Sequence, residues 1–402
     1  MIYEDNGTAY VELPYEGVYE MPSTLVSMSE EALDYCMSIT EIVIPTSFTK
    51  WTACVGLESL EKIKVEEGNS IYCSENNILF SKDKTKLVKI PANAIGTEYV
   101  IPETVKEIDE YAFSDCDSLT VVTISKNVSI GSKSETIGNS TFEYKGQNYF
   151  KDCVSLQGIE VVEENPNYIA KDGILFTKDG SCLVAMPRGY QTWGYTVPED
   201  VTEIGCEAFY GIRELEYIEL PEGLETIGIG AFRNSGLTSI VIPERVQTIP
   251  SSTFFYCEEL SSVEILGHIR YIGDQAFYYC SFLTTIENFE YVNYIGKRAF
   301  YNCDGLIGIR VSVNVIGEDA FKWCSNLEYV YILEGTTTIE DGAFSACNNL
   351  KELWLPKSVV DINGQIVSRS SRNLMIYVPV DSVAEEYVRE KRLTFSLYEG
   401  FY

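Results

Sequence analysis

Hydrophobic residues recur along this chain in a pattern whose period is a little over twenty residues. The phrase Ala-Phe-x-x-Cys-x-x-Leu-x-x-Ile returns with small variations through the C-terminal half. Its phenylalanines follow one another at steps of 21 to 23 residues: Phe209, Phe232, Phe254, Phe277, Phe300, Phe321 and Phe344. A nearly constant period of this size is typical of a solenoid, in which each repeat forms one coil that stacks on the previous coil. The pattern therefore predicts a repeat architecture.

Within one repeat, the apolar spacing predicts three points that face the core. The segment from Leu237 to Ile242 ends in an alternation of period two, which predicts a short strand with one buried face. Pro243 ends this strand because proline has no N–H for a ladder. Ile227-Gly228 gives a second buried point and a turn. The Ala-Phe pair predicts a short helical turn on the opposite wall, and we expect parallel strand pairing between coils.

A longer repeat predicts insertions in two of the coils. Residues 65–113 match residues 161–209 at a constant offset of 96, so that Ile78-Leu79-Phe80 returns as Ile174-Leu175-Phe176. The dipeptides around these strands are typical of tight turns: Asn76-Asn77, Asp83-Lys84, Asp172-Gly173 and Asp179-Gly180. We expect a β-hairpin inserted near residues 67–91, another near residues 164–187, and a separate surface insertion at residues 130–149.

Both ends of the chain depart from the repeat, as terminal caps do. Asn6-Gly7 lies between two apolar segments and predicts a hairpin turn. Ser382 with Glu385 predicts the start of a helix that runs to about Lys391 and is followed by a strand at residues 393–397. We therefore expect one solenoid over residues 1–402, with an N-terminal cap at 1–30, about eleven coils at 31–375 and a C-terminal cap at 376–402.

Charge and hydropathy limit the partners of the chain. The sequence has 60 acidic and 30 basic residues, which gives a formal net charge of −30. Such a surface repels phosphate backbones and anionic lipids, so we expect no nucleic-acid partner. No run of apolar residues is long enough for a transmembrane segment. Acidic residues crowd the N-terminus and the first basic residue is Lys50, so we expect either a cytoplasmic protein or a chain that has lost its leader.

Cysteine is the first candidate for chemistry, with twelve residues in the chain. Eight of them occupy the repeat position: Cys36, Cys116, Cys153, Cys257, Cys280, Cys303, Cys324 and Cys347. We expect buried free thiols there, because Cβ vectors in stacked coils run parallel and because Ile212 and Ser235 fill the same position in two coils. Disulfides between adjacent coils are the alternative. The sequence has no Cys-x-x-Cys pair and predicts no zinc site.

The sequence contains few sets of residues that could form a catalytic site. His268 is the only histidine, and it follows the expected strand at residues 263–266, where a surface turn is predicted. A Ser-His triad or a histidine-rich metal site would have to rely on this one residue. Carboxylates are abundant, but no pair is marked out as the acid and base of a glycosidase. We therefore expect no enzyme, no metal and no cofactor.

The strongest functional signal lies at the strand positions that face outward. Counting the Leu of the repeat as zero, positions two and four point away from the core, and most coils place small or charged residues there. The last coils differ, since they place Tyr329, Tyr331 and Trp354 there, flanked by Arg310 and Glu352. Tyrosine, tryptophan and arginine dominate binding hot spots, and aromatic faces stack on sugars. We predict a ligand-binding surface; coverage by the C-terminal cap and ordinary cross-strand pairing are the alternatives.

A second group of aromatic residues follows the phenylalanine of the repeat. We expect these side chains to stack between coils and to shield the opposite wall. They are Phe255, Tyr256, Tyr278, Tyr279, Tyr301 and Trp323.

The recurrent blocks closely resemble the BspA-like leucine-rich repeat family. The matching blocks are Ile-Pro, Ile-Gly, Ala-Phe-x-x-Cys and Leu-x-x-Ile-x-Ile, with the segment Asp172–Phe176 and the ending Tyr377-Val378-Pro379. The resemblance covers nearly the whole chain and implies a right-handed leucine-rich-repeat solenoid with a parallel sheet on one face, short helical or 3₁₀ turns on the other and β-hairpin insertions. It also implies a secreted or surface-displayed protein of mucosal anaerobic bacteria.

The same resemblance implies adhesion to host proteins or to other bacteria. We therefore expect a monomeric, non-enzymatic binding protein at the cell surface or outside the cell, whose partner is a host extracellular protein or glycan. The alternative function is a structural spacer that displays another module at the cell surface.

Overall fold

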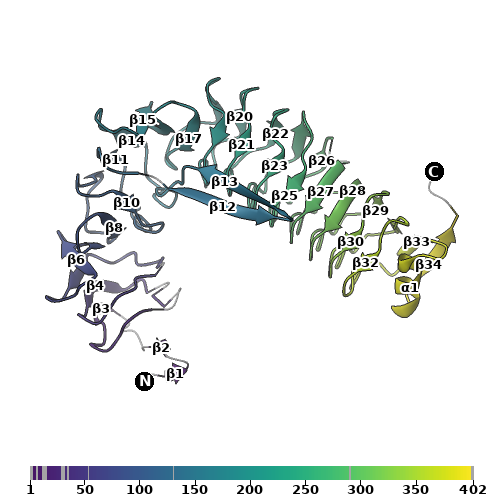
Figure 1. Cartoon of the computed structure of the whole chain (residues 1–402), viewed down its shortest axis with the longest axis horizontal. Helices are drawn as coiled ribbons and strands as arrows, with labels where there is room; N and C mark the ends of the chain where they lie inside the picture. Colours follow the sequence, from purple (N-terminus) through teal and green to yellow (C-terminus); the bar gives the residue numbers. More distant parts are fainter. Residues whose placement is uncertain are drawn as a thin grey trace. The chain divides into compact units, whose positions relative to one another are not determined.

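The computed structural model of the protein describes residues 3–5, 8–10, 16–28, 32–33, 36–52, 54–129, 131–288 and 291–399. The chain divides into two compact units, one formed by residues 1–131 and 146–191 and the other by residues 132–145 and 192–402. Each unit is a stack of short β-strands (Figure 1), and the described residues contain one α-helix, α1 (Val383–Glu390). The predicted solenoid class is confirmed.

Parallel strands form the walls of the first unit. One sheet contains β3 (Gly17–Glu20), β4 (Ile39–Ile44) and β5 (Lys62–Val65), and another contains β9 (Glu98–Val100), β11 (Val121–Ile124) and β14 (Gly158–Val161). Because β3 pairs in parallel with β4, coil stacking includes residues that the sequence assigns to the N-terminal cap. The predicted turn Asn6-Gly7 lies outside the described residues, but β1 (Tyr3–Asp5) and β2 (Thr8–Tyr10) on either side of it pair antiparallel.

The two predicted hairpin insertions are three-stranded meanders. The first contains β6 (Tyr72–Glu75), β7 (Ile78–Ser81) and β8 (Lys86–Lys89), and the second contains β15 (Tyr168–Lys171), β16 (Ile174–Thr177) and β17 (Cys182–Ala185). Their bounds differ by the same offset of 96 that the sequence shows. Asn76 and Asn77 both have positive φ, as do Asp172 and Gly173, so each dipeptide is a turn that matches the twist of its flanking strands. Each insertion therefore contains two successive antiparallel strand pairs, where the sequence predicted one hairpin.

The Leu-x-x-Ile-x-Ile segments of the second unit form the predicted parallel strands, which we call the main sheet. These strands are β18 (Gly194–Thr196), β20 (Tyr217–Glu219), β22 (Ser239–Ile242), β24 (Ser262–Ile265), β26 (Thr285–Ile286), β28 (Gly308–Ile316), β29 (Tyr329–Ile332), β31 (Glu352–Trp354), β33 (Met375–Pro379) and β34 (Phe395–Tyr398). Positions three and five are buried, as Val263 and Ile265 illustrate. Positions two and four therefore face outward, as predicted.

In the second unit, further parallel strands follow the Ile-Gly positions, where the sequence predicted only a buried point and a turn. We call them the second sheet: β19 (Glu203–Ile204) pairs with β21 (Thr226–Ile227), and a separate ladder contains β23 (Thr248–Ile249), β25 (Tyr271–Ile272), β27 (Tyr291–Ile295), the end of β28, β30 (Thr338–Ile339) and β32 (Asp361–Ile362). In the first unit, β10 (Glu107–Ile108) pairs in parallel with β8. Two residues are too few to show a strand period in the sequence.

The wall that carries the repeated phenylalanines consists of hydrogen-bonded turns, where the sequence predicted short helical or 3₁₀ turns. Gly230 and Asn234 have φ of +62° and +58°, which a right-handed helix does not allow. The N–H of Arg233 closes a turn onto the oxygen of Gly230 at 2.9 Å, whereas the N–H groups of Phe232 and Asn234 donate to the next coil at 3.0 and 2.8 Å. Backbone hydrogen bonds therefore join the coils on this wall too.

The repeated phenylalanines form one buried column inside the second unit. Adjacent rings from Phe209 to Phe344 lie 5.0 to 5.5 Å apart between centroids and are nearly parallel. Burying one such ring stabilises the fold by about 1.5–3 kcal/mol. The fixed period in the sequence therefore places one phenylalanine of each coil in this column.

The predicted surface insertion is a long antiparallel hairpin that belongs to the second unit. It contains β12 (Ser132–Ile137) and β13 (Ser140–Lys145), and Figure 1 draws it alongside β21, β23 and β25. The ring of Phe142 contacts the ring of Tyr271 at 5.4 Å between centroids. The carboxylate of Glu135 accepts hydrogen bonds from the Tyr144 hydroxyl at 3.0 Å and from the N–H of Ser251 at 3.1 Å. The hairpin thus covers part of the second sheet.

The C-terminal end follows the prediction closely. Helix α1 begins after Ser382, whose hydroxyl accepts the N–H of Glu385 at 3.1 Å. Strand β34 then pairs in parallel with β33. Tyr387 and Val388 are buried as predicted, but Val383 is exposed and Ala384 takes its place in the core.

Candidate binding surface

Strands β29 and β31 bring the three predicted aromatic residues together on the main sheet. Tyr331 and Trp354 are register partners, and their ring centroids lie 6.1 Å apart with an angle of 26° between the ring planes. Tyr329 lies beside Tyr331 at a centroid distance of 6.1 Å. Tyr329 is 42% exposed, whereas Tyr331 and Trp354 are half-buried. The outward positions of neighbouring strands therefore form a continuous aromatic surface.

Two tyrosines that the sequence analysis did not single out extend this surface. Tyr377 stacks on Trp354 with 3.9 Å between centroids and 10° between planes. Tyr398 lies 5.5 Å from the Trp354 ring, and its hydroxyl donates to the main-chain oxygen of Leu355 at 2.7 Å. We call Tyr329, Tyr331, Trp354, Tyr377 and Tyr398 the aromatic ladder. Tyr377 belongs to the predicted C-terminal cap at 376–402, so the cap covers one face of Trp354.

Glu352 holds two of the rings in place. Its Oε2 accepts a hydrogen bond from the Tyr331 hydroxyl at 3.2 Å and another from Nε1 of Trp354 at 3.1 Å. Desolvation of the hydroxyl, together with the neighbouring Glu352 charge, raises the pKa of Tyr331. The residue predicted as a charged flank is therefore a positioning group for the aromatic side chains.

Arg310 and Gly308 on β28 form the other border of the ladder. Arg310 is the register partner of Tyr331, is exposed, and has no ion pair within the described part of the chain. Gly308 is the register partner of Tyr329, and a Cβ at this glycine would overlap the Tyr329 ring. Tyr329 therefore lies over the strand at a place where only glycine fits.

The repeat cysteines of the second unit, from Cys257 to Cys347, form a buried column and not a reactive site. All twelve cysteines are free thiols, and ten of them are buried. Burial raises the pKa of the Cys257 thiol to about 11 and that of the Cys347 thiol to about 12. A thiol must ionise to act as a nucleophile or a metal ligand, so these groups are inert near neutral pH.

A buried ammonium group in the first unit is the other candidate for chemistry. The Lys89 side chain is 1% exposed, and its Nζ donates to the main-chain oxygens of Ser114 at 2.7 Å and Tyr111 at 3.5 Å. It also contacts Oδ2 of Asp115 at 3.3 Å. Three acceptors for three N–H groups satisfy this ammonium group completely.

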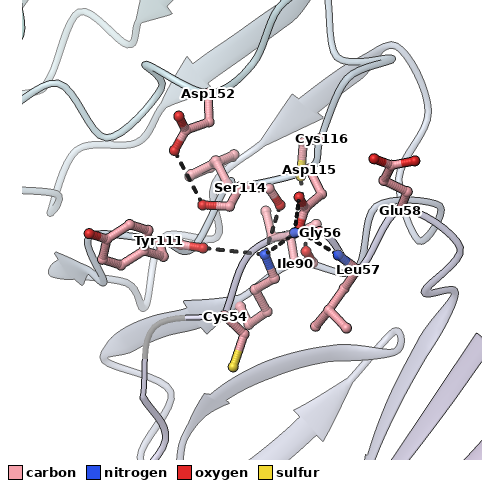
Figure 2. A network of polar contacts seen from close by, with 12 residues as sticks. Cys54, Gly56, Leu57, Glu58, Ile90, Tyr111, Ser114, Asp115, Cys116 and Asp152 are labelled. Carbon is pink, nitrogen blue, oxygen red and sulfur yellow. Dashed lines mark hydrogen bonds and ion pairs between the residues drawn. The ribbon is translucent and has the colours of Figure 1, made fainter. Parts of the chain in front are cut away.

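Asp115 carries the same network to a neighbouring loop. Its carboxylate accepts the N–H of Gly56 at 2.8 Å and that of Leu57 at 3.3 Å, and Figure 2 shows the three residues close together. Ser114 beside it donates to Asp152 at 3.3 Å. Every polar group here is paired inside the protein, so the network ties coils together and has no group aimed at a substrate.

The remaining candidate residues, His268 and the second group of aromatic residues, show no sign of a functional site. His268 is exposed in the segment after β24, as predicted. Phe255, Tyr278 and Tyr301 stack at 4.8 and 4.9 Å on the opposite wall, which confirms their structural role. Among the described residues, no group of three or more histidine, cysteine, aspartate or glutamate side chains could hold a metal ion. None of the helices described has the length and apolar character to cross a bilayer.

Parallel coils with an aliphatic sheet, a phenylalanine column and a cysteine column define a leucine-rich-repeat solenoid. A family model described as the BspA type leucine rich repeat region matches residues 18–98, 58–145, 92–172, 191–307 and 257–374. These segments cover most of the chain, so the protein belongs to the BspA-type leucine-rich repeat family.

Solved structures that are similar to this chain come from several bacteria. A leucine-rich repeat protein from Eubacterium ventriosum is 19% identical, with a TM-score of 0.54 over 89% of this chain and 92% of that one. A leucine rich cell surface protein from Faecalibacterium prausnitzii is 18% identical, with a TM-score of 0.42 over 83% and 94%. The pneumococcal vaccine antigen PcpA is 17% identical, with a TM-score of 0.42 over 96% and 89%. No curated protein matches the chain.

Proposed function

We propose that this is a non-enzymatic binding protein that acts at the surface of a bacterial cell or outside it. It adheres, as a monomer, to a host extracellular protein or glycan through the main sheet of its last coils. The observation that carries this proposal is the aromatic ladder with the exposed Arg310 beside it, since these residue types dominate protein-binding hot spots. Family membership supports the non-enzymatic role.

The geometry of the ladder favours a protein over a glycan. Sugars bind to open aromatic faces, but Tyr331, Trp354 and Tyr377 are stacked against one another. What they present to a partner is ring edges and hydroxyl groups. Tyr329 and Arg310 are the exposed elements, and both suit a protein interface. We therefore propose a protein surface as the main target.

The test uses one exposed residue and one matched control. Tyr329→Ala removes a 42% exposed ring from the ladder, and Tyr256→Ala removes a 37% exposed ring from the opposite wall. On arrays of extracellular-matrix proteins and mucosal glycans, we expect Tyr329→Ala to weaken binding roughly tenfold or more, and Tyr256→Ala to leave it unchanged. Equal binding by both variants would contradict the assigned surface. An absence of any ligand for the parent chain would favour the spacer function.

A further inference from the structure

A second feature of the main sheet lies far from the ladder in the sequence. A hollow of about 830 Å³ lies over β20 and β22. It lies where the hydrogen bonding between strands of the main sheet is interrupted, because β20 pairs with β18 whereas β22 pairs with β24. We call this hollow the acidic groove. Its lining includes three exposed apolar residues, Tyr217, Val241 and Leu266, which we call the floor, and four glutamates, Glu199, Glu219, Glu222 and Glu244, which we call the rim.

The floor of the acidic groove is apolar and open to solvent. Tyr217 is 48% exposed, Val241 is 43% exposed and Leu266 is 54% exposed. Tyr217 and Val241 occupy outward strand positions, which most other coils fill with small or charged side chains. Contiguous exposed apolar surface inside a charged rim is typical of an interaction site.

The charged residues of the rim are all glutamates. Glu199, Glu222 and Glu244 are exposed and form no ion pair among the described residues, and Glu219 accepts a hydrogen bond from the Thr196 hydroxyl at 3.1 Å. Arg245 is the one cationic residue in the lining, and its guanidinium pairs with Glu225 at 3.3 Å. The groove therefore repels phosphate, sulfate and carboxylate ligands and attracts cations.

We propose that the acidic groove binds an extended cationic segment of a partner protein, in which an apolar side chain is flanked by lysine or arginine. The apolar side chain covers the exposed floor. The long basic side chains pack their methylene groups along Tyr217 and place their charges against Glu222 and Glu244 on the rim. This site goes beyond the function proposed for the ladder, because the two surfaces share no residue.

The test measures binding of labelled ten-residue peptides by fluorescence anisotropy. The probe alternates lysine with leucine, and two control peptides alternate lysine with serine or glutamate with leucine. We expect the lysine–leucine peptide to bind roughly tenfold more tightly than the lysine–serine peptide, and the glutamate–leucine peptide not to bind. Equal binding of both lysine peptides would overturn the proposal, because it would reduce the effect to the net charge of the protein.

Variants then locate the binding in the groove. Glu222→Gln with Glu244→Gln should weaken the lysine–leucine peptide roughly fivefold, whereas Glu258→Gln with Glu259→Gln makes the same change in net charge elsewhere and should have no effect. Tyr217→Ser should weaken binding roughly tenfold, while Tyr329→Ser on the ladder should leave it unchanged. Equal losses from the paired variants would contradict the groove, and the Tyr329 arm keeps this result separate from the ladder.

Discussion

The thiol of Cys257 donates a hydrogen bond of 2.9 Å to the main-chain oxygen of Phe232, one coil earlier. That oxygen also accepts the N–H of Ser235 at 3.1 Å, so the thiol satisfies its second lone pair. The arrangement recurs for Cys280 with Phe254, Cys303 with Phe277, Cys324 with Phe300 and Cys347 with Phe321, at 3.1 to 3.2 Å. In the next coil the hydroxyl of Ser370 donates to Phe344 at 3.0 Å. In these six coils the position therefore holds a small donor, although Ile212 fills it in an earlier coil.

Substitutions at Cys303 separate the donor from the volume. Cys303→Ala removes the hydrogen bond and leaves a small cavity, so we expect a loss of about 1–2 kcal/mol in the free energy of unfolding. Cys303→Ser keeps a donor, as Ser370 does, and should cost less than half as much. Urea unfolding followed by circular dichroism measures both. If the alanine variant were as stable as the serine variant, the hydrogen bond would contribute nothing.

The same column makes the protein sensitive to alkaline pH. Burial raises the pKa of the Cys257 thiol from 9.0 to about 11, so the folded chain keeps this proton when the unfolded chain has already lost it. The unfolded state then binds fewer protons, and stability falls as pH rises from about 9 to about 11, by about 1.4 kcal/mol per pH unit for each buried thiol. Thermal unfolding from pH 7 to pH 10 should show this decline. Cys257→Ser should reduce its slope by one proton, and an unchanged slope would contradict this origin.

Much of this fold could be predicted from the sequence, but not all of it. The phenylalanine period and the alternation in Leu-x-x-Ile-x-Ile predicted the solenoid and its main sheet, because both patterns recur in most coils of the second unit. The positive φ values within the turn wall were not predicted, because these positions hold Gln275, Tyr279 and Trp323, which are not typical turn residues. Tyr377 was missed as part of the ladder because its coil lacks the Ala-Phe-x-x-Cys phrase, although it occupies the same strand position as Trp354.

The buried Lys89–Asp115 pair should be costly to break from one side. Lys89→Ala leaves the Asp115 carboxylate without its cation inside the protein, so we expect a loss of about 3–5 kcal/mol in the free energy of unfolding. The equivalent residues in the second copy of the repeat are Ala185 and Gly211. The double variant Lys89→Ala with Asp115→Gly therefore copies a natural combination, and it should lose less than the sum of the two single variants. Additive losses in chemical unfolding would contradict this coupling.

The insertion hairpin should detach more easily than the coils that it covers. Phe142→Ala removes the ring contact with Tyr271 but leaves the hydrogen bonds of Glu135 in place. We expect the amides of β12 and β13 to exchange with deuterium at least roughly tenfold faster, with little change for the buried column. Uniform acceleration across the second unit would instead show that the hairpin unfolds with the coils.

Gly308→Ala tests whether the position of the Tyr329 ring matters for binding. A methyl group at residue 308 would overlap this ring and force it away from the sheet. Because Tyr329 is 42% exposed and lies outside the core, the loss in stability should stay below about 1 kcal/mol. Ligand binding by the ladder should nevertheless weaken about as much as in Tyr329→Ala. The control is Gly158→Ala, at the same strand position of a coil in the first unit, where a Cβ meets no neighbouring atom. Full binding by Gly308→Ala would show that the ladder binds its partner without a fixed Tyr329.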